Sequence, residues 1–393
     1  MPVSAPLGDL TPDEFLSTYW QKRPVVIRDA LPDVEPPLSP DEMAGLACEP
    51  DVESRLIEGS AEAHNWTLRD GPFTPEDFAA LPATHWTLLV QQLDRLLPAV
   101  EKLRSRFRFI PDWRIDDVMA SYAPRGGSVG PHIDHYDVFL LQMSGERRWH
   151  IGAEPVVDET LVPDADLRVL ADFTPAATHD LTPGDMLYLP PRVAHHGISR
   201  DDDCMTFSIG FRAPSVREAL YDFAQFAYDD LDERLFYRDP DLMPTAHPGQ
   251  VDAEVVQRFR ALFSEATSDA ERIRRWIGLW ATRTQAPEPL DPPCTPADVQ
   301  KNVGAGRGLQ RHHTARIVYT ERPNGSVVLT ANGTTYALDA ADAFMGPFLT
   351  DRMHIPAALL APYMDHDAFV DVLAALVTER VFTFVSPDDA LTD

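Results

Sequence analysis

Apolar residues gather in short runs of strand length near the start of the chain, at 24–27, 86–90 and 137–141. Three helix-start signals stand among them. Each is a hydroxyl residue followed by proline and, at the third helical position, by a carboxylate. They begin at Thr11, Ser39 and Thr74. The pattern therefore predicts helices first, with strands increasing towards residue 210.

From Val118 to Phe211 the chain reads as short strands separated by glycine and proline. Such breaks occur at 125–127, 144–145 and 182–185. This regular punctuation favours an antiparallel sandwich or barrel over strands that alternate with helices.

A helical pattern begins after Pro214, where Ser215 and Glu218 form a capping box. Two further helices are predicted by apolar residues that recur on one face, at 255–263 and at 273–280. Helices this apolar need a partner, which is either an internal bundle or a second copy of the chain. The pattern alone does not decide between the two.

The proline-rich stretch 286–293 is stiff and marks a boundary. Beyond it, apolar runs at 317–319 and 327–329 flank Asn324-Gly325, a hairpin-turn signal, and Asn332-Gly333 offers a second turn. Helical patterns lie on both sides of this ribbon. The combination is compatible with a winged-helix module.

The composition limits the number of domains and the kinds of function that the chain can have. The chain has 393 residues and 44% hydrophobic residues, which is enough for packed cores in two or three domains. It has no apolar run of 18 residues and no signal-like amino terminus, so we expect a cytoplasmic protein without a membrane segment. Its three cysteines, Cys48, Cys204 and Cys294, are far apart and suggest neither a disulfide framework nor a thiolate zinc site.

The formal net charge of -28 disfavours a general affinity for nucleic-acid phosphates and favours a basic partner. Acidity that serves only solubility fits the charge equally well. The carboxy-terminal region shows no dense basic cluster with interleaved aromatics, so we expect no direct nucleic-acid binding there.

The candidate chemistry begins at His132 and Asp134, which are two residues apart. On an extended strand both side chains project to the same face and can bind one ion, although an isolated triplet of this kind is usually a surface feature. A Gly-Asp turn, an apolar strand and two prolines then lead to the pair His195 and His196. Two histidines and one carboxylate leave a face of an octahedral ion open, as non-haem Fe(II) oxygenases require, whereas zinc sites are more often tetrahedral and filled. Spacing alone does not separate His195 from His196.

Several segments together are specific enough to indicate a family. They are 112–117, 130–134, 136–139, 147–149, 190–197 and 211–214. In them the sequence resembles the JmjC-type cupin oxygenases and, within these, the bacterial ribosomal-protein arginine hydroxylases. The resemblance covers roughly residues 5–215 well and the remainder more loosely.

The resemblance implies an α+β protein built on a double-stranded β-helix, the jelly-roll of cupin and JmjC proteins, with flanking helices. This oxygenase domain would span 1–213. A helical dimerisation region would follow at 214–288 and a winged-helix-like domain at 289–393. A homodimer is therefore expected.

The resemblance also assigns roles to residues. The metal ligands would be His132, Asp134 and His195, because the family's last ligand lies five residues after the first proline, Pro190. His196 would then be an exposed or second-layer imidazole. Arg147, with help from Ser121, would pair the distal carboxylate of 2-oxoglutarate. A surface role for Arg147 is the alternative.

Counting back by twos from Ser121 gives Met119 and Asp117, which face the same interior if they lie on one strand. A carboxylate near the iron can bind a cationic substrate side chain, with Tyr136 adding its ring or phenol. The alternative is that Asp117 only ties down a loop.

What the resemblance implies for activity is Fe(II)-, 2-oxoglutarate- and dioxygen-dependent hydroxylation at C3 of an arginine in a basic large-subunit ribosomal protein of the L-sixteen family. Hydroxylation of a ribosomal-protein histidine or demethylation of lysine would use the same fold. A non-catalytic cupin module, which binds metal for structure or recruits partners, is the alternative from another class.

Overall fold

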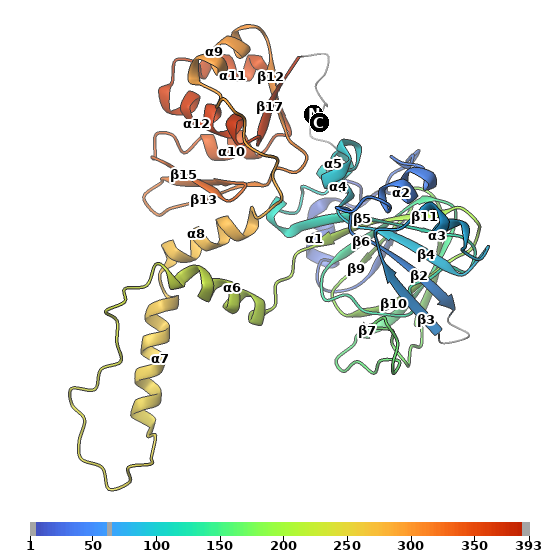
Figure 1. Cartoon of the computed structure of the whole chain (residues 1–393), viewed down its shortest axis with the longest axis horizontal. Coiled ribbons are helices and arrows are strands. Elements are labelled where there is room, and N and C mark those ends of the chain that lie inside the picture. Colours follow the sequence, from blue (N-terminus) through green and yellow to red (C-terminus); the bar gives the residue numbers. More distant parts are fainter. Residues whose placement is uncertain (1–4, 61–64, 387–393) are drawn as a thin grey trace. The chain divides into compact units, whose positions relative to one another are not determined.

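The computed structural model describes residues 5–60 and 65–386 (Figure 1). Its contacts divide the chain into two compact units, the first ending at Ala213 and the second beginning at Pro214. Within the described residues, no helix is both long enough and apolar enough to cross a membrane.

Short helices open the first unit at the three predicted places. Thr11, Ser39 and Thr74 each accept a hydrogen bond from the backbone three residues on, and the carboxylate there bonds back. These helices are α1 (Pro12–Thr18), α2 (Pro40–Leu46) and α3 (Pro75–Ala79), and α4 (Leu93–Leu96) and α5 (Pro98–Ser105) follow. The helix starts read from the sequence are confirmed.

The first unit is built on two antiparallel sheets. The larger has the order β1-β9-β6-β11-β5-β4-β2-β3 and the smaller the order β10-β7-β8. The strands of the larger sheet are β1 (Val25–Ile27), β2 (Ser54–Ser60), β3 (Asn65–Asp70), β4 (Trp86–Val90), β5 (Ile115–Ala123), β6 (Val138–Ser144), β9 (Met186–Leu189) and β11 (Cys204–Phe211), and those of the smaller are β7 (Arg147–Pro155), β8 (Ala177–Leu181) and β10 (Val193–Ser199). From β6 onwards the chain passes repeatedly from one sheet to the other, which is the topology of a double-stranded β-helix. The predicted jelly-roll is confirmed.

The faces of β6 show how the larger sheet positions the site. Phe139 and Leu141 pack into the core shared with α1 and α2, whereas Val138 and Leu140 pack with Trp149 of the smaller sheet. Successive residues of a strand point to opposite faces, so the larger sheet is covered on both sides. The interior between the two sheets is where the polar positions of β5 and β11 also point.

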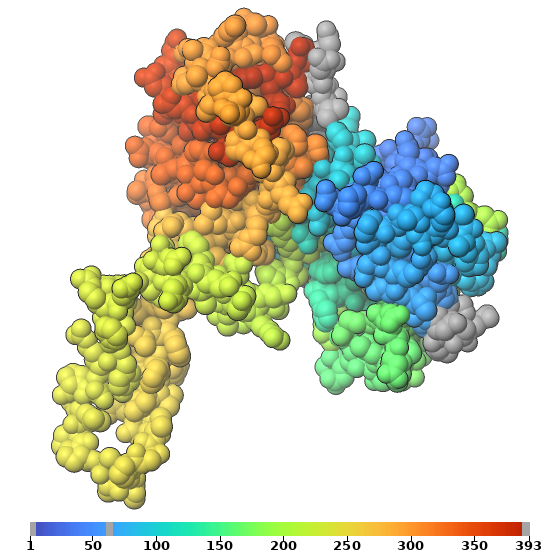
Figure 2. Space-filling model, in the orientation of Figure 1, coloured from blue at the N-terminus to red at the C-terminus, as the bar shows by residue number. Residues whose placement is uncertain are grey.

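The second unit begins with three helices: α6 (Val216–Tyr228), α7 (Ala253–Thr267) and α8 (Ala270–Ala281). The capping box of Ser215 and Glu218 is present. Helix α8 packs on strand β14, because a Cβ atom at Gly278 would lie 2.6 Å from Oγ1 of Thr330. Figure 2 shows α7 and the chain that leads into it standing out from the rest of this unit as an arm.

The remainder of the second unit is a mixture of helices and two three-stranded sheets, with the orders β16-β12-β17 and β13-β14-β15. Its elements are α9 (Pro296–Gly304), β12 (Gly308–Arg311), β13 (Ile317–Glu321), β14 (Val327–Ala331), β15 (Thr334–Leu338), α10 (Met345–Thr350), β16 (His354–Ile355), α11 (Ala357–Leu360), α12 (Asp367–Thr378) and β17 (Phe382–Val385). Both hairpin turns lie where predicted, and Asn332 and Gly333 have the positive φ angles, 46° and 83°, that such a turn requires. The boundary between residues 288 and 289 stays a prediction.

Candidate active site

Backbone hydrogen bonds bring the segment that carries His132 next to the segment that carries His195. The peptide nitrogen of His132 bonds the oxygen of His195 at 3.0 Å, and the nitrogen of His195 bonds the oxygen of His132 at 2.9 Å. In such a pair both side chains project to the same face. The imidazole ring centres consequently lie only 4.2 Å apart.

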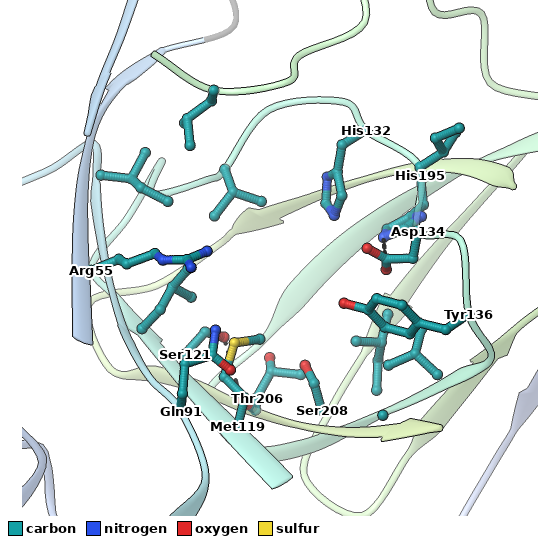
Figure 3. A pocket seen from close by; sticks show the side chains of 18 of the residues that line it. Arg55, Gln91, Met119, Ser121, His132, Asp134, Tyr136, His195, Thr206 and Ser208 are labelled. Carbon is teal, nitrogen blue, oxygen red and sulfur yellow. Dashed lines mark hydrogen bonds and ion pairs between the residues drawn. The ribbon is translucent and has the colours of Figure 1, made fainter. Parts of the chain in front are cut away.

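Asp134 completes a cluster of three ligand groups. One nitrogen of His132, one of His195 and one carboxylate oxygen of Asp134 lie within 4.8 Å of one another (Figure 3). In residues 5–60 and 65–386, no other group of three histidine, cysteine or acidic side chains has ligand atoms gathered in this way. The structure thus brings together the three side chains assigned to the metal.

Each imidazole is oriented by a backbone carbonyl. Nδ1 of His132 lies 3.0 Å from the oxygen of Gly130, and Nδ1 of His195 lies 3.0 Å from the oxygen of Val193. A carbonyl can only accept, so Nδ1 carries the proton and Nε2 keeps its lone pair for a metal. Burial, together with the neighbouring His132, lowers the pKa of His195 to about 4, so this ring is neutral at physiological pH. Two imidazoles that present Nε2 and one carboxylate fit Fe(II) and leave half of an octahedral sphere open.

A cavity of about 270 Å³ opens beside the three groups. Arg147, which is 3% exposed, lines it, and within the described part of the chain its Nε and Nη2 have no hydrogen-bond partner. Its guanidinium carbon lies 5.9 Å from the ring centre of Trp149. A buried charge with unpaired donors is costly until an anion pairs with it. The cavity therefore suits a small carboxylate ligand.

Ser121 lies beside this arginine pocket, and its hydroxyl donates to the oxygen of Thr206 at 3.3 Å. The hydroxyl of Thr206 donates to Oε1 of Gln142 at 2.9 Å. Thr206 and Ser208 also line the cavity but were not singled out from the sequence. They are two polar residues at alternate positions of the fully buried strand β11, paired with Ser121 and Met119. That alternation is the signal that could have found them.

The other end of the cavity is acidic and aromatic. Asp117, Met119 and Tyr136 line it, so Asp117, Met119 and Ser121 do face one interior. Burial, and then the charges of Asp116 and Asp94, raise the pKa of Asp117 to about 7. The charge of Asp134, together with burial, raises the pKa of Tyr136, whose phenol stays protonated. Figure 3 shows Tyr136 next to Asp134.

Three neighbours of these residues point elsewhere. His196 lies on the opposite face of β10 from His195 and is only 6% exposed, so of its two predicted roles the exposed ring is wrong and the second-layer imidazole stays a prediction. His135 is largely exposed near Glu159. Arg148 forms a two-bond ion pair with Asp180, away from the cavity.

A buried aspartate behind the site was missed by the sequence reading. Asp137 is fully buried and accepts hydrogen bonds from Tyr188 at 2.7 Å, Gln21 at 2.9 Å and Arg114 at 3.1 Å. It fixes the chain directly after Tyr136. Its position one residue past a candidate site tyrosine gave no sign of this network.

Comparison with known proteins decides the family. A JmjC domain model matches residues 102–219, an AraC-like ligand binding domain model matches 175–276, and a ROXA-like winged helix model matches 265–382. The ribosomal protein uL16 3-hydroxylase of Escherichia coli is 34% identical over 380 residues, which are 94% of this chain and 97% of that protein. The chain belongs to the JmjC-domain ribosomal oxygenases. The predicted family is therefore confirmed.

A second relative and a solved structure extend the comparison. A probable ribosomal oxygenase of Haemophilus influenzae is 34% identical over 334 residues, 80% of each chain. The structure of YcfD, a ribosomal oxygenase from E. coli in complex with cobalt and 2-oxoglutarate, is 33% identical with a TM-score of 0.82 and covers 96% of this chain and 98% of its own. The likeness spans both units, including the winged helix.

Proposed function

We propose that the protein is an Fe(II)- and 2-oxoglutarate-dependent oxygenase that hydroxylates C3 of an arginine in the large-subunit ribosomal protein uL16. The observation that carries the proposal is the convergence of His132, Asp134 and His195 beside the buried, unpaired Arg147. The similarity to a uL16 3-hydroxylase over nearly the whole chain supports the choice of substrate.

His132, Asp134 and His195 hold the iron. When bound, the iron, 2-oxoglutarate and dioxygen supply the oxidation that inserts one oxygen atom into an unactivated C–H bond and releases succinate and carbon dioxide. Backbone carbonyls orient both imidazoles so that their Nε2 atoms face one point, and the two sheets enclose that point. Exclusion of water protects the reactive centre from side reactions.

Arg147 binds the distal carboxylate of 2-oxoglutarate, and the Ser121 hydroxyl adds a second donor when its hydrogen turns from the Thr206 oxygen to the ligand. A guanidinium presents two parallel N–H groups that match the geometry of a carboxylate. Arg147 has Nε and Nη2 unpaired and ready for this contact. A monoanion of the same length would be held less well, because only one end of it would carry a charge.

Asp117 binds the cationic side chain of the substrate, while Met119 and Tyr136 provide the apolar walls for its methylene groups. Tyr136 is 43% exposed, so it stands at the mouth of the cavity where a protein side chain enters. The net charge of -28 favours encounter with a basic ribosomal protein by long-range attraction. A protein that acts on ribosomal proteins belongs in the cytoplasm.

A second copy of the chain covers the exposed apolar residues of α6 and of the arm, giving a homodimer. Large exposed side chains gather in the second unit between Val216 and Phe263. They are Val216, Leu220, Tyr221, Tyr228, Leu235, Phe236, Leu242, Met243, Val251, Val256, Phe259 and Phe263. So many exposed apolar residues in one part of a chain mark an interaction surface.

The decisive test is to incubate the purified protein with uL16, Fe(II) and 2-oxoglutarate and to locate any added oxygen by peptide mass spectrometry. The proposal predicts one added oxygen on arginine, lost in His132→Ala and Asp134→Ala. An added oxygen on histidine, or loss of a methyl group from lysine, would favour the related activities instead. Absence of succinate formation from 2-oxoglutarate would favour a non-catalytic module.

A further inference from the structure

We infer that His196 is a positioning residue for the metal centre: through the hydroxyl of Ser128 it holds the backbone nitrogen of Gly130, the residue whose carbonyl oxygen orients His132. The inference rests on the proposed function, because it takes His132 as a ligand of iron. It assigns a role to the second imidazole of the His195-His196 pair, which does not reach the metal cluster itself.

The first link joins His196 to Ser128. Nε2 of His196 lies 2.8 Å from the Ser128 hydroxyl oxygen, and both side chains are buried. The segment carrying Ser128 runs along β10, since Ser199 donates to Gly127 and His195 donates to His132 through the backbone. His196 thus faces the loop that leads to the first ligand.

The direction of this hydrogen bond follows from the second link. The Ser128 oxygen accepts a hydrogen bond from the nitrogen of Gly130 at 3.0 Å, so its own hydrogen is free to be donated to His196. The Nε2 atom of His196 is then the acceptor of this hydrogen bond.

The third link ends on the ligand. The carbonyl of Gly130 accepts from Nδ1 of His132 at 3.0 Å, which fixes the tautomer and the tilt of that ring. Gly130 has a φ of +80°, and a Cβ atom there would lie 3.0 Å from Val169, so this position requires glycine. Gly130 lies outside the named strands, so no ladder fixes its peptide. The hydrogen bond from its nitrogen to Ser128 fixes the peptide plane that precedes Gly130, and the φ and ψ angles of Gly130 then place its carbonyl relative to that plane.

The test compares two amide replacements at one position. In His196→Gln the amide reaches the place of Nε2, whereas in His196→Asn it stops at the place of Nδ1, too short for Ser128. We expect His196→Asn to weaken Co(II) binding by about 10- to 100-fold and to alter the Co(II) d–d absorption bands. We expect His196→Gln to stay within about threefold of the wild type, since it restores the contact to Ser128.

Ser128→Ala deletes the hydroxyl group that bonds both His196 and Gly130, and so provides a second variant with little change of shape. Its loss of Co(II) affinity should be at least that of His196→Asn, and the double variant should be no worse than Ser128→Ala alone, because both changes break one chain of contacts. His150→Asn is the matched control: His150 faces the ring of His196 at 6.1 Å but bonds Thr178.

Equal weakening by His196→Gln and His196→Asn, or additive effects of Ser128→Ala and His196→Asn, would overturn the inference in favour of simple packing. Unchanged Co(II) spectra in both Ser128→Ala and His196→Asn would overturn it as well. Thermal unfolding of the metal-free variants separates lost metal affinity from lost fold. If the wild type itself bound no Co(II), or if His132→Ala left Co(II) binding unchanged, the metal site of the proposed function would fail instead.

Discussion

The buried guanidinium of Arg147 carries a desolvation cost that pairing with an anionic ligand would offset. The guanidinium has two unpaired donors, so Arg147→Gln should raise KM for 2-oxoglutarate by about 30-fold or more, corresponding to roughly 2 kcal/mol for a charged hydrogen-bonded pair. The metal-free variant should be no less stable than the wild type, because an unpaired buried charge has been removed. Uncoupled turnover of 2-oxoglutarate and thermal unfolding measure the two effects.

Arg148→Gln is the control for that experiment, since Arg148 pairs with Asp180 outside the cavity. It should leave KM for 2-oxoglutarate unchanged. An Arg147→Gln variant with the wild-type KM would show that the cosubstrate is anchored elsewhere.

Asp117 links substrate binding to pH. Its pKa is raised to about 7 by burial and by neighbouring carboxylates, so the group is mostly neutral below this pH and mostly charged above it. Only the charged form pairs with a guanidinium, and kcat/KM for the protein substrate should therefore rise about tenfold from about pH 6 to about pH 8. Asp117→Asn should lower kcat/KM and remove the inflection. The same inflection in Asp117→Asn would assign the titration to another group.

At the residue scale, the sequence predicted more of the site than of its surroundings. The count from Ser121 to Asp117 depends on the geometry of strand β5. The spacing of His132 and Asp134 was read as a strand, and although they lie between β5 and β6, outside the named strands, all of these side chains gather at one cavity. The choice between His195 and His196 depends on which of them pairs with His132 across two strands. The local sequence around either histidine does not specify which of them pairs with His132.

Strand β6 begins beside the ion pair of Asp137 and Arg114, which anchors the segment that carries His132 and Asp134. Asp137→Asn keeps the shape but removes the charge facing Arg114, and it should lower the free energy of unfolding by about 2–4 kcal/mol, somewhat less than for a fully buried pair because Arg114 is partly exposed. Metal affinity should fall too, since Asp137 lies three residues after Asp134. Denaturant unfolding of the metal-free protein measures the first effect.

Asp116→Asn is the control, because Asp116 is exposed and pairs with Arg212 at 3.1 Å. Pairs of this kind contribute at most about 1 kcal/mol. If Asp137→Asn and Asp116→Asn cost the same, the Tyr188–Asp137–Arg114 network would not be what anchors that segment.

Elements with a local chemical signal were predictable, and those defined by distant partners were not. The capping boxes at Thr11, Ser39 and Thr74 depend on four consecutive residues and lie where expected. The hairpin of β2 and β3 was missed because charged residues such as Arg55 and Arg69 interrupt its apolar alternation. This hairpin joins the edge of the larger sheet because β2 pairs with β4, and the residues 54–70 by themselves do not encode that distant pairing.

At the scale of the whole molecule, the two units have separate cores, one around Phe139 and one around Phe369. The site lies entirely in the first unit, whereas the group of exposed apolar residues between Val216 and Phe263 lies in the second. A change on the arm should consequently alter association without altering the chemistry of the cavity. That independence makes the dimer testable apart from the oxygenase activity.

Helix α7 offers the sharpest test of the dimer. Val256 and Phe263 are seven residues apart on one face and are 50% and 64% exposed. The double change Val256→Glu and Phe263→Glu should convert a dimer to a monomer, because charges cannot be desolvated in an apolar interface. Light scattering gives the mass, and uncoupled turnover of 2-oxoglutarate should be unchanged. Leu359→Glu, at an equally accessible residue of α11, should stay dimeric. A monomeric wild type, or a dimeric double variant, would exclude α7 as the interface.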